Sequence, residues 1–241
     1  RLLPILDAEI SGALADSLQR SGARLMFESQ VDSVTRTSEG LAVQVGEVTL
    51  CADAVLHALG RTGNVEGLGL GEAGVESDSR GRVRVDDQFM TTVQGIYAAG
   101  DITGPPGLAS VAMEQARVAM CRAFDIPFKE SLDTMVPTGI YTLPEVSMVG
   151  LTEEAARTAS GDVATGRTYF SGNARARISG STEGVLKLVF RQSDRRLLGA
   201  HILGAEATEL IHIAQALLHR DGAIDEFIDT TSNFPTRADA N

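Results

Sequence analysis

Gly100 and Asp101 follow a short apolar run at residues 95–99 and precede a loop with the sequence ITGPPG. A ligand can lie close against a glycine backbone, because glycine has no Cβ. A carboxylate such as that of Asp101 accepts hydrogen bonds from hydroxyl groups, so it suits a sugar or polyol chain. We interpret residues 95–99 as a buried strand, which would place the acid where open parallel sheets bind ligands.

An alanine-rich helix is predicted from Leu108 to Phe124, directly after this loop. The first N–H groups of a helix have no partner within the helix, and this end carries a partial positive charge. The backbone at Leu108 and Ala109 would therefore stabilise an anion, or a carbonyl that gains negative charge. The local pattern fits an ordinary strand–loop–helix turn equally well.

A second glycine-led segment, GRTGN at residues 60–64, follows the apolar run 54–59. We predict that this run is a buried parallel strand. Gly60 would let a ligand approach the backbone, and Arg61 would place a guanidinium beside a phosphate or a ring face. From spacing alone, a glycine-rich surface turn is the other interpretation.

The chain has 241 residues and a formal net charge of −11, which argues against nucleic acid as a main partner. It has no run of about twenty apolar residues, so we expect no membrane span and a cytoplasmic location.

Cys51 and Cys121 form no metal or redox spacing, and we expect both to be buried. Glu209 and His212 have the spacing of a di-iron helix, but no second pair accompanies them, so no metal is expected. Arg1 in place of a methionine suggests a piece of a longer chain.

The remaining elements follow from hydrophobic periodicity, caps and turns. The first half is expected to hold a capped helix and short strands, at residues 7–21, 24–28, 31–36, 41–45 and 48–51. The second half is expected to be α+β, with strands at 145–149 and 166–170, a hairpin of 184–192 with 196–202, and helices at 152–159 and 206–219.

The segment IYAAGD, with the helix start after it, resembles the second flavin signature of the pyridine nucleotide-disulphide oxidoreductase family. The GRTGN segment resembles the place where that family returns from its NAD to its FAD domain. The segments VPTGIYTLPEVSMVGLTEEAA and LLGAHILGAEATELIHIAQALL resemble its dimerisation domain. The resemblance covers essentially the whole chain and points to the family's soluble NAD(P) transhydrogenase branch.

The resemblance implies a fold that is α/β and then α+β. A partial, Rossmann-like part would hold the end of the NAD(P)-binding domain (1–64) and the FAD-domain return segment (65–133), followed by a dimerisation domain (134–241). In family members the Asp binds the flavin ribityl chain and the helix N–H groups meet the flavin ring. The implied positions are Asp101 and Ala109 for FAD, and Gly60 and Val31 for NAD(P). Gly100, Leu108 and Arg61 complete the candidate cofactor-binding residues, on the local chemistry given above.

Phe234 occupies the place where disulphide reductases of this family carry a histidine that serves as acid and base. A phenyl ring cannot transfer a proton. We therefore favour hydride exchange between NADPH and NAD⁺ through FAD, in a homodimer, with no catalytic side chain assigned. The alternatives are a dihydrolipoamide dehydrogenase-like disulphide reductase and a non-catalytic dimerisation module. We expect the chain by itself to be inactive and not to retain FAD.

Overall fold

The computed structural model describes residues 1–240; Asn241, the last residue of the predicted dimerisation domain, lies outside the described residues. The chain forms two compact units, each assembled from separate stretches of sequence. The first unit comprises residues 1–34, 43–50 and 135–241, and the second comprises residues 35–42 and 51–134.

The first unit is built on a five-stranded antiparallel sheet, in which the strand order is β4-β5-β8-β7-β6. The strands are β4 (Thr138–Ile140), β5 (Val146–Gly150), β6 (Val163–Tyr169), β7 (Gly184–Arg191) and β8 (Leu197–Gly204). The predicted hairpin is confirmed as β7 and β8. Its turn is fixed locally, because Asp194 accepts a hydrogen bond from the Arg196 N–H and Arg195 adopts a φ of 58°.

Two helices of this unit, α1 (Ala8–Arg20) and α3 (Glu153–Ser160), each begin after a side chain that caps them. Asp7 accepts a hydrogen bond from the Glu9 N–H, and Thr152 accepts one from the Ala155 N–H. The other helices are α4 (Ala174–Ser179), α5 (Ala207–Leu218) and α6 (Asp225–Asp229). The predictions for α1, α3 and α5 are confirmed to within one or two residues at each end.

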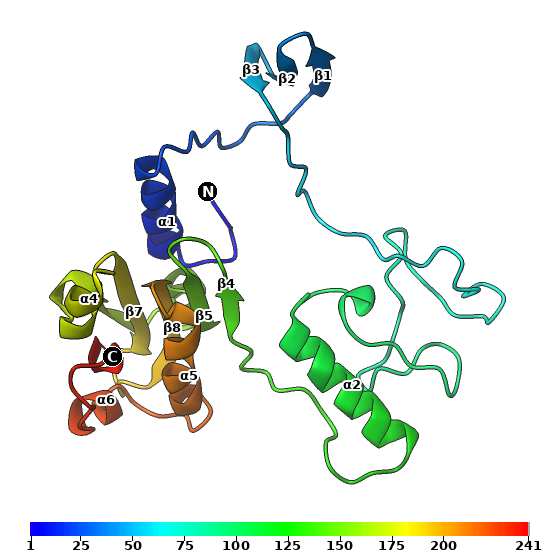
Figure 1. The fold of residues 1–241 in the computed structure, drawn as a ribbon. Helices are drawn as coiled ribbons and strands as arrows, with labels where there is room; N and C mark the ends of the chain where they lie inside the picture. Colours follow the sequence, from blue (N-terminus) through cyan, green and yellow to red (C-terminus); the bar gives the residue numbers. More distant parts are fainter. Residues whose placement is uncertain (241) are drawn as a thin grey trace. The chain divides into compact units, whose positions relative to one another are not determined.

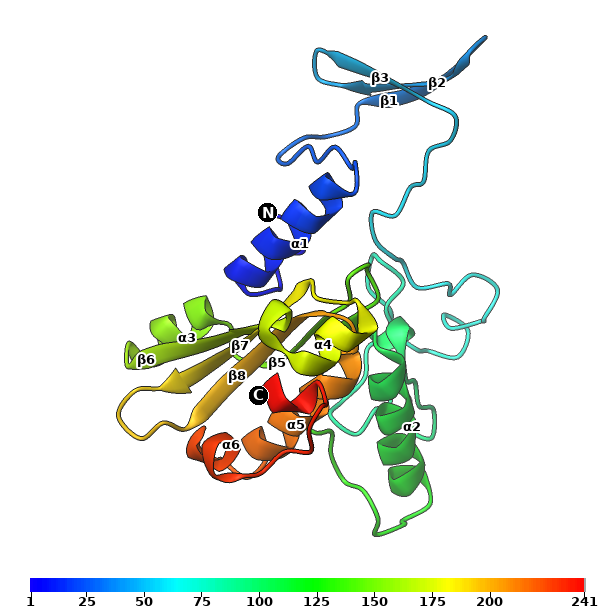
Figure 2. The same cartoon turned by 60° about the vertical axis from the view of Figure 1, so that its left-hand side comes forward.

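Two helices bury opposite faces of the sheet (Figures 1 and 2). Successive residues of a strand point to opposite faces. Val185 of β7 and its partner Leu203 of β8 pack with α1, whereas Leu186 and Ile202, the next pair along, pack with α5. The sheet therefore has no water-exposed face at its centre, which explains the apolar runs in both strands.

A buried lysine joins α1 to the sheet. The Lys187 ammonium lies 2.8 Å from the Asp7 carboxylate, 2.8 Å from that of Glu153 and 3.1 Å from that of Glu9. The side chains of Lys187 and Asp7 are only 3% and 1% exposed. Asp7 also accepts the Glu153 N–H at 3.1 Å, and Arg167 binds Glu9 at 2.7 Å. We call Lys187 and its three carboxylates the lysine cage.

The lysine cage keeps its members ionised despite their burial. Burial alone would raise the pKa of Asp7, but hydrogen bonds from Lys187 and from the Glu153 N–H hold that pKa below its usual value. Burial would also lower the pKa of Lys187, and its hydrogen bonds to the carboxylates raise it instead. Burial lowers the pKa of the neighbouring His201, whose Nε2 lies 3.0 Å from the Leu151 carbonyl oxygen.

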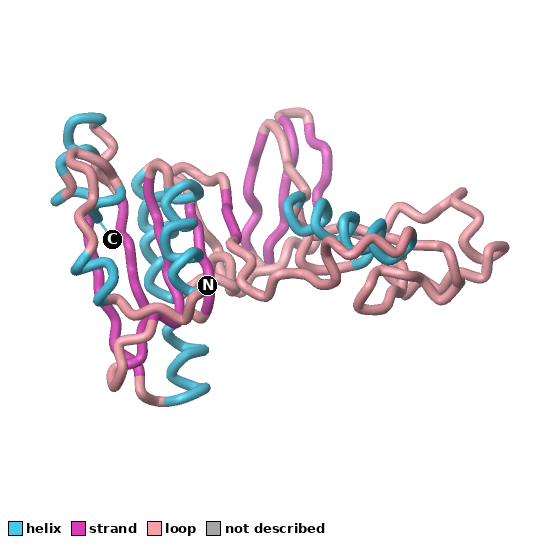
Figure 3. Tube along the Cα trace, turned by 90° about the horizontal axis from the view of Figure 1, so that it is seen from below, coloured by secondary structure: helices cyan, strands magenta, loops and turns pink. Residues whose placement is uncertain are grey.

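A three-stranded meander follows α1 in the chain, and its residues are divided between the two units. Its strands β1 (Ser33–Thr37), β2 (Gly40–Val45) and β3 (Val48–Ala52) lie side by side in that order (Figure 3). They overlap the strands predicted at residues 31–36, 41–45 and 48–51. The second unit contains α2 (Ala109–Ala123), the predicted alanine-rich helix. Phe89, Val118 and Ala119 form its buried apolar cluster.

Three strand predictions are wrong: residues 24–28, 54–59 and 95–99 form no regular strand. Leu56 is 90% exposed, and Tyr97 makes only an isolated bridge with Met90. A parallel strand needs a neighbouring strand to complete its hydrogen bonds, and none pairs with these runs among residues 1–240. Cys121 is buried as expected, but Cys51 is exposed because it lies in the meander strand β3.

No helix among the described residues is long and apolar enough to span a membrane.

Replacing Lys187 by Met is expected to destabilise the first unit by about 3 kcal/mol, because it leaves the buried Asp7 carboxylate without its cation. Native-state hydrogen exchange of the β7 and β8 amides measures this change. Arg20→Gln, which removes only the exposed pair with Glu183, is the matched control. Equal protection in the wild type and in Lys187→Met would contradict the role assigned to the lysine cage.

The same measurement at different pH values tests the sign of the effect. The folded-state pKa values of Asp7, Glu9 and Glu153 are lowered, so their stabilisation is present above their usual values of 3.8 and 4.5 and is lost as the pH falls through the folded-state values. Wild-type protection should therefore fall on acidification, and the fall should be smaller in Lys187→Met.

Candidate functional site

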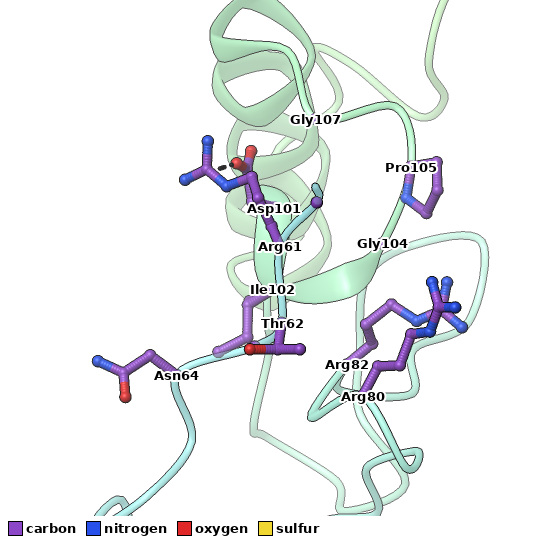
Figure 4. A pocket seen from close by; sticks show the side chains of 12 residues that line it. Arg61, Thr62, Asn64, Arg80, Arg82, Asp101, Ile102, Gly104, Pro105 and Gly107 are labelled. Carbon is purple, nitrogen blue, oxygen red and sulfur yellow. Dashed lines mark ion pairs between the residues drawn. The ribbon is translucent and has the colours of Figure 1, made fainter. Parts of the chain in front are cut away.

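The second unit contains a cavity of about 540 Å³. Three segments line it: residues 60–64, the two arginines on either side of Gly81, and the loop 101–107 (Figure 4). All three segments are irregular, so hydrogen bonds and close backbone contacts rather than a sheet hold them in place.

Two glycines hold the first two segments together. The Gly63 N–H donates a 2.7 Å hydrogen bond to the Arg80 carbonyl oxygen. A Cβ on Gly63 would lie 1.9 Å from the Gly81 carbonyl oxygen, and a Cβ on Gly81 would lie 2.6 Å from that of Gly63. Only glycine allows two backbones to approach this closely. The contact thus explains why the GRTGN segment needs its second glycine.

The loop that carries Asp101 is tied to α2. Gly100 has a φ of 90°, which favours glycine, and its N–H donates to the buried Gln115 side chain at 2.6 Å. Thr103 returns a side-chain hydrogen bond to the Gly100 carbonyl at 2.9 Å. A short 3₁₀ turn, η1 (Asp101–Thr103), results and orients the Asp101 carboxylate.

The start of α2 lies next to that carboxylate. A Cβ on Gly107 would lie 3.5 Å from an Asp101 carboxylate oxygen, and Gly107 is one residue before the helix cap Leu108. No side chain of the described residues caps α2, and Ala109 is exposed. The first N–H groups of the helix therefore remain available to a ligand that also reaches Asp101.

Arg61 pairs with Asp101 across the cavity, with 3.2 Å between the guanidinium and the carboxylate. The Arg61 side chain is 83% exposed, so this ion pair is screened by water and contributes little to stability. A hydroxyl-bearing ligand can therefore compete for the Asp101 oxygens at low cost.

The structure brings most of the predicted cofactor-binding residues into one place. The cavity lining includes Gly60, Arg61 and Asp101, while Gly100, Leu108 and Ala109 directly adjoin it in the chain. Val31 is not part of the lining and stays a prediction. The sequence analysis missed Arg80 and Arg82, although three arginines alternate at 80, 82 and 84 in an acidic chain.

The C-terminal segment that contains Phe234 is anchored in the first unit. The Asn173 side chain donates to the Thr236 carbonyl at 3.0 Å and to the Asp239 carboxylate. The side chain of Arg237 is buried and donates to that of Ser179 at 2.9 Å. Phe234 itself is 69% exposed, so the segment presents an aromatic ring that cannot titrate.

Among residues 1–240 no group of three or more His, Cys, Asp or Glu side chains could hold a metal ion. The two cysteines are both free thiols.

Two models of one family match the chain. The first, described as pyridine nucleotide-disulphide oxidoreductase, matches residues 1–116, and the second, its dimerisation domain, matches residues 136–241. Among curated relatives, the soluble pyridine nucleotide transhydrogenases of Marinobacter nauticus and Vibrio atlanticus are 42% and 39% identical over 100% of this chain. The chain spans 52% of each relative, about half its length.

Solved structures agree on the fold. The HOCl-induced flavoprotein disulfide reductase RclA from Escherichia coli superposes with a TM-score of 0.92 at 27% identity, over 98% of this chain and 55% of that one. LpdA from Mycobacterium tuberculosis gives a TM-score of 0.87 at 30% identity, over 98% of this chain and 52% of that one. The expected fold class, α/β followed by α+β, is thereby confirmed.

Replacing Gly63 by Ala is expected to destabilise the second unit by roughly 1–3 kcal/mol, because the new methyl group meets the Gly81 backbone. Gly71→Ala is the control, since a Cβ there meets nothing within 4 Å. Amide exchange in α2 and NMR shifts of residues 60–64 and 80–82 report the change. Wild-type shifts in Gly63→Ala would show that the close contact is not required.

Proposed function

Because the chain belongs to the pyridine nucleotide-disulphide oxidoreductase family, we propose that its full-length form exchanges hydride between NADPH and NAD⁺ through FAD, as a homodimer. The observation that carries this proposal is the position of Asp101, which lines the cavity and lies beside the uncapped start of α2. The relatives named transhydrogenases, which match from end to end of the chain, support it.

The residues of the cavity fit the chemistry of FAD. Its ribityl hydroxyl groups need an acceptor, which Asp101 supplies. Its ring gains negative charge on reduction, and the N–H groups at Leu108 and Ala109 would stabilise that charge. Bound FAD supplies the hydride acceptor and donor that protein side chains lack.

The chain's own residues would then bind the flavin and the nicotinamide nucleotide and orient them. Asp101 would hold the polyol chain, with Gly100 close to it, and Arg61 would be released from its ion pair toward an anionic group. Gly60 would let the nicotinamide nucleotide approach the backbone. No proton transfer by a side chain is needed, which agrees with an exposed phenyl ring at Phe234.

A flavin-dependent disulphide reductase is the second candidate, favoured by the fold similarity to the reductase RclA. Phe234 argues against a disulphide reductase, because the resemblance implies that related reductases carry a residue at this position that serves as acid and base. The third candidate is a non-catalytic dimerisation module, which would bind neither FAD nor nucleotides.

The deciding experiment uses the full-length protein, purified with its flavin. NADPH-dependent reduction of thio-NAD⁺ is followed with no disulphide present. We expect rapid turnover, because two nicotinamide nucleotides suffice as substrates. No turnover until a disulphide is added would establish the reductase instead. A full-length protein that purifies without flavin and turns over in neither assay would favour the dimerisation module.

Asp101→Asn in the full-length protein is expected to weaken FAD binding by roughly tenfold or more, because hydrogen bonds to a charged acceptor contribute about 1.5–3 kcal/mol. Flavin released on dilution, measured by its fluorescence, reports the change. Asp87→Asn removes the same charge from an exposed turn outside the cavity and is the control. Equal retention of FAD by both variants would show that Asp101 does not bind FAD.

A further inference from the structure

The cavity is positively charged in a strongly acidic protein. Its lining holds three guanidinium groups, from Arg61, Arg80 and Arg82, and one carboxylate, from Asp101, which leaves two positive charges. The whole chain carries a net charge of −11. A local excess of cations against such a background favours an anionic ligand at this place.

Asp78 fixes the turn that presents two of these arginines. Its Oδ1 accepts hydrogen bonds from the backbone N–H groups of Arg80 and Arg82, at 2.8 and 2.9 Å. Its Oδ2 accepts a 2.6 Å hydrogen bond from the Arg82 Nε. Asp78 is not part of the cavity lining, so it orients Arg82 from behind and does not occupy the cavity.

Arg80 has a different environment. Its side chain forms no ion pair among residues 1–240, whereas Arg82 pairs with Asp78 and Arg84 pairs with Glu76. Figure 4 shows Arg80 and Arg82 extending in the same direction, toward the loop that holds Gly104 and Pro105. The Arg82 side chain reaches this loop, since a Cβ on Gly104 would lie 3.4 Å from its Cδ.

Among the described residues Asp78 pairs with the Arg82 guanidinium only, so the charge of Arg80 is uncompensated and both guanidinium groups keep unused donors. Guanidinium forks match the oxygen atoms of phosphate in pairs, and such charge-assisted hydrogen bonds are stronger than neutral ones. A carboxylate has two oxygens and a single charge. A phosphoryl group offers more oxygen atoms and can accept from both arginines at once.

We propose that Arg80 and Arg82 form a subsite for a phosphoryl group of the dinucleotide bound in this cavity. The identity of that dinucleotide rests on the proposed flavin-dependent function, whereas the anion chemistry of the subsite does not. Asp78 is the residue that positions Arg82, and the contact between Gly63 and Gly81 holds the turn against the GRTGN segment.

The test is an NMR titration of the whole chain with inorganic pyrophosphate at constant ionic strength. We expect shift changes at residues 80–82 and 101–107, with affinity that falls by about tenfold in Arg80→Gln, because a charge-assisted hydrogen bond is lost. Arg82→Gln should show a similar loss. Arg84→Gln removes an exposed arginine outside the cavity and should bind like the wild type.

Arg80→Gln keeps the test decisive even if Arg82→Gln disturbs the turn, because the Arg80 side chain takes no part in it. Absence of pyrophosphate binding by the wild-type chain would overturn the proposal. An equal loss in all three variants would also overturn it, since it would show general attraction to positive charge.

Two further ligands separate this proposal from the proposed function. ADP carries the pyrophosphate without a flavin, and riboflavin carries the ring and polyol without phosphate. Binding of pyrophosphate and ADP that depends on Arg80 supports the subsite even without riboflavin binding, since the chain by itself is not expected to retain the flavin. Riboflavin binding that depends on Asp101 would support a flavin site. If Arg80→Gln then has no effect on pyrophosphate binding, the phosphoryl subsite is overturned.

Discussion

The candidate site depends on the close passage of two backbones at Gly63 and Gly81. Among residues 1–240 no strand ladder supports the cavity, and this contact, with the hydrogen bond from Gly63 to Arg80, holds two of its three lining segments together. The contact joins the GRTGN segment to the turn that carries Arg80 and Arg82. Any side chain larger than hydrogen at either glycine would separate them.

Charge is used in two opposite ways in this protein. In the lysine cage one buried cation meets three carboxylates, and every member has a partner. Such an arrangement holds α1 on the sheet and leaves nothing for a ligand. In the cavity, exposed arginines outnumber the carboxylates, and Arg80 has no ion pair among residues 1–240. Incomplete pairing at an exposed site is what an anionic ligand requires.

Elements whose signals are local could be predicted from the sequence. Asp7 and Thr152 cap the helices that the periodicity indicated, and the turn at Asp194 forms the hairpin. The apolar runs 54–59 and 95–99 failed as strand predictions for a physical reason. A parallel strand is stabilised by its neighbours, so an apolar run without a partner strand stays irregular however well its composition suits a sheet.

The sequence by itself determined the family resemblance, the helices and hairpin of the first unit, and the glycine and acid at residues 100–101. Only the tertiary structure decided which charges meet. Lys187 and Asp7 are 180 residues apart in the chain and share a hydrogen bond, and Arg80 shares a cavity with Arg61 and Asp101. Caps and turns act over a few residues, whereas ion pairs and cavities are made by segments that folding brings together.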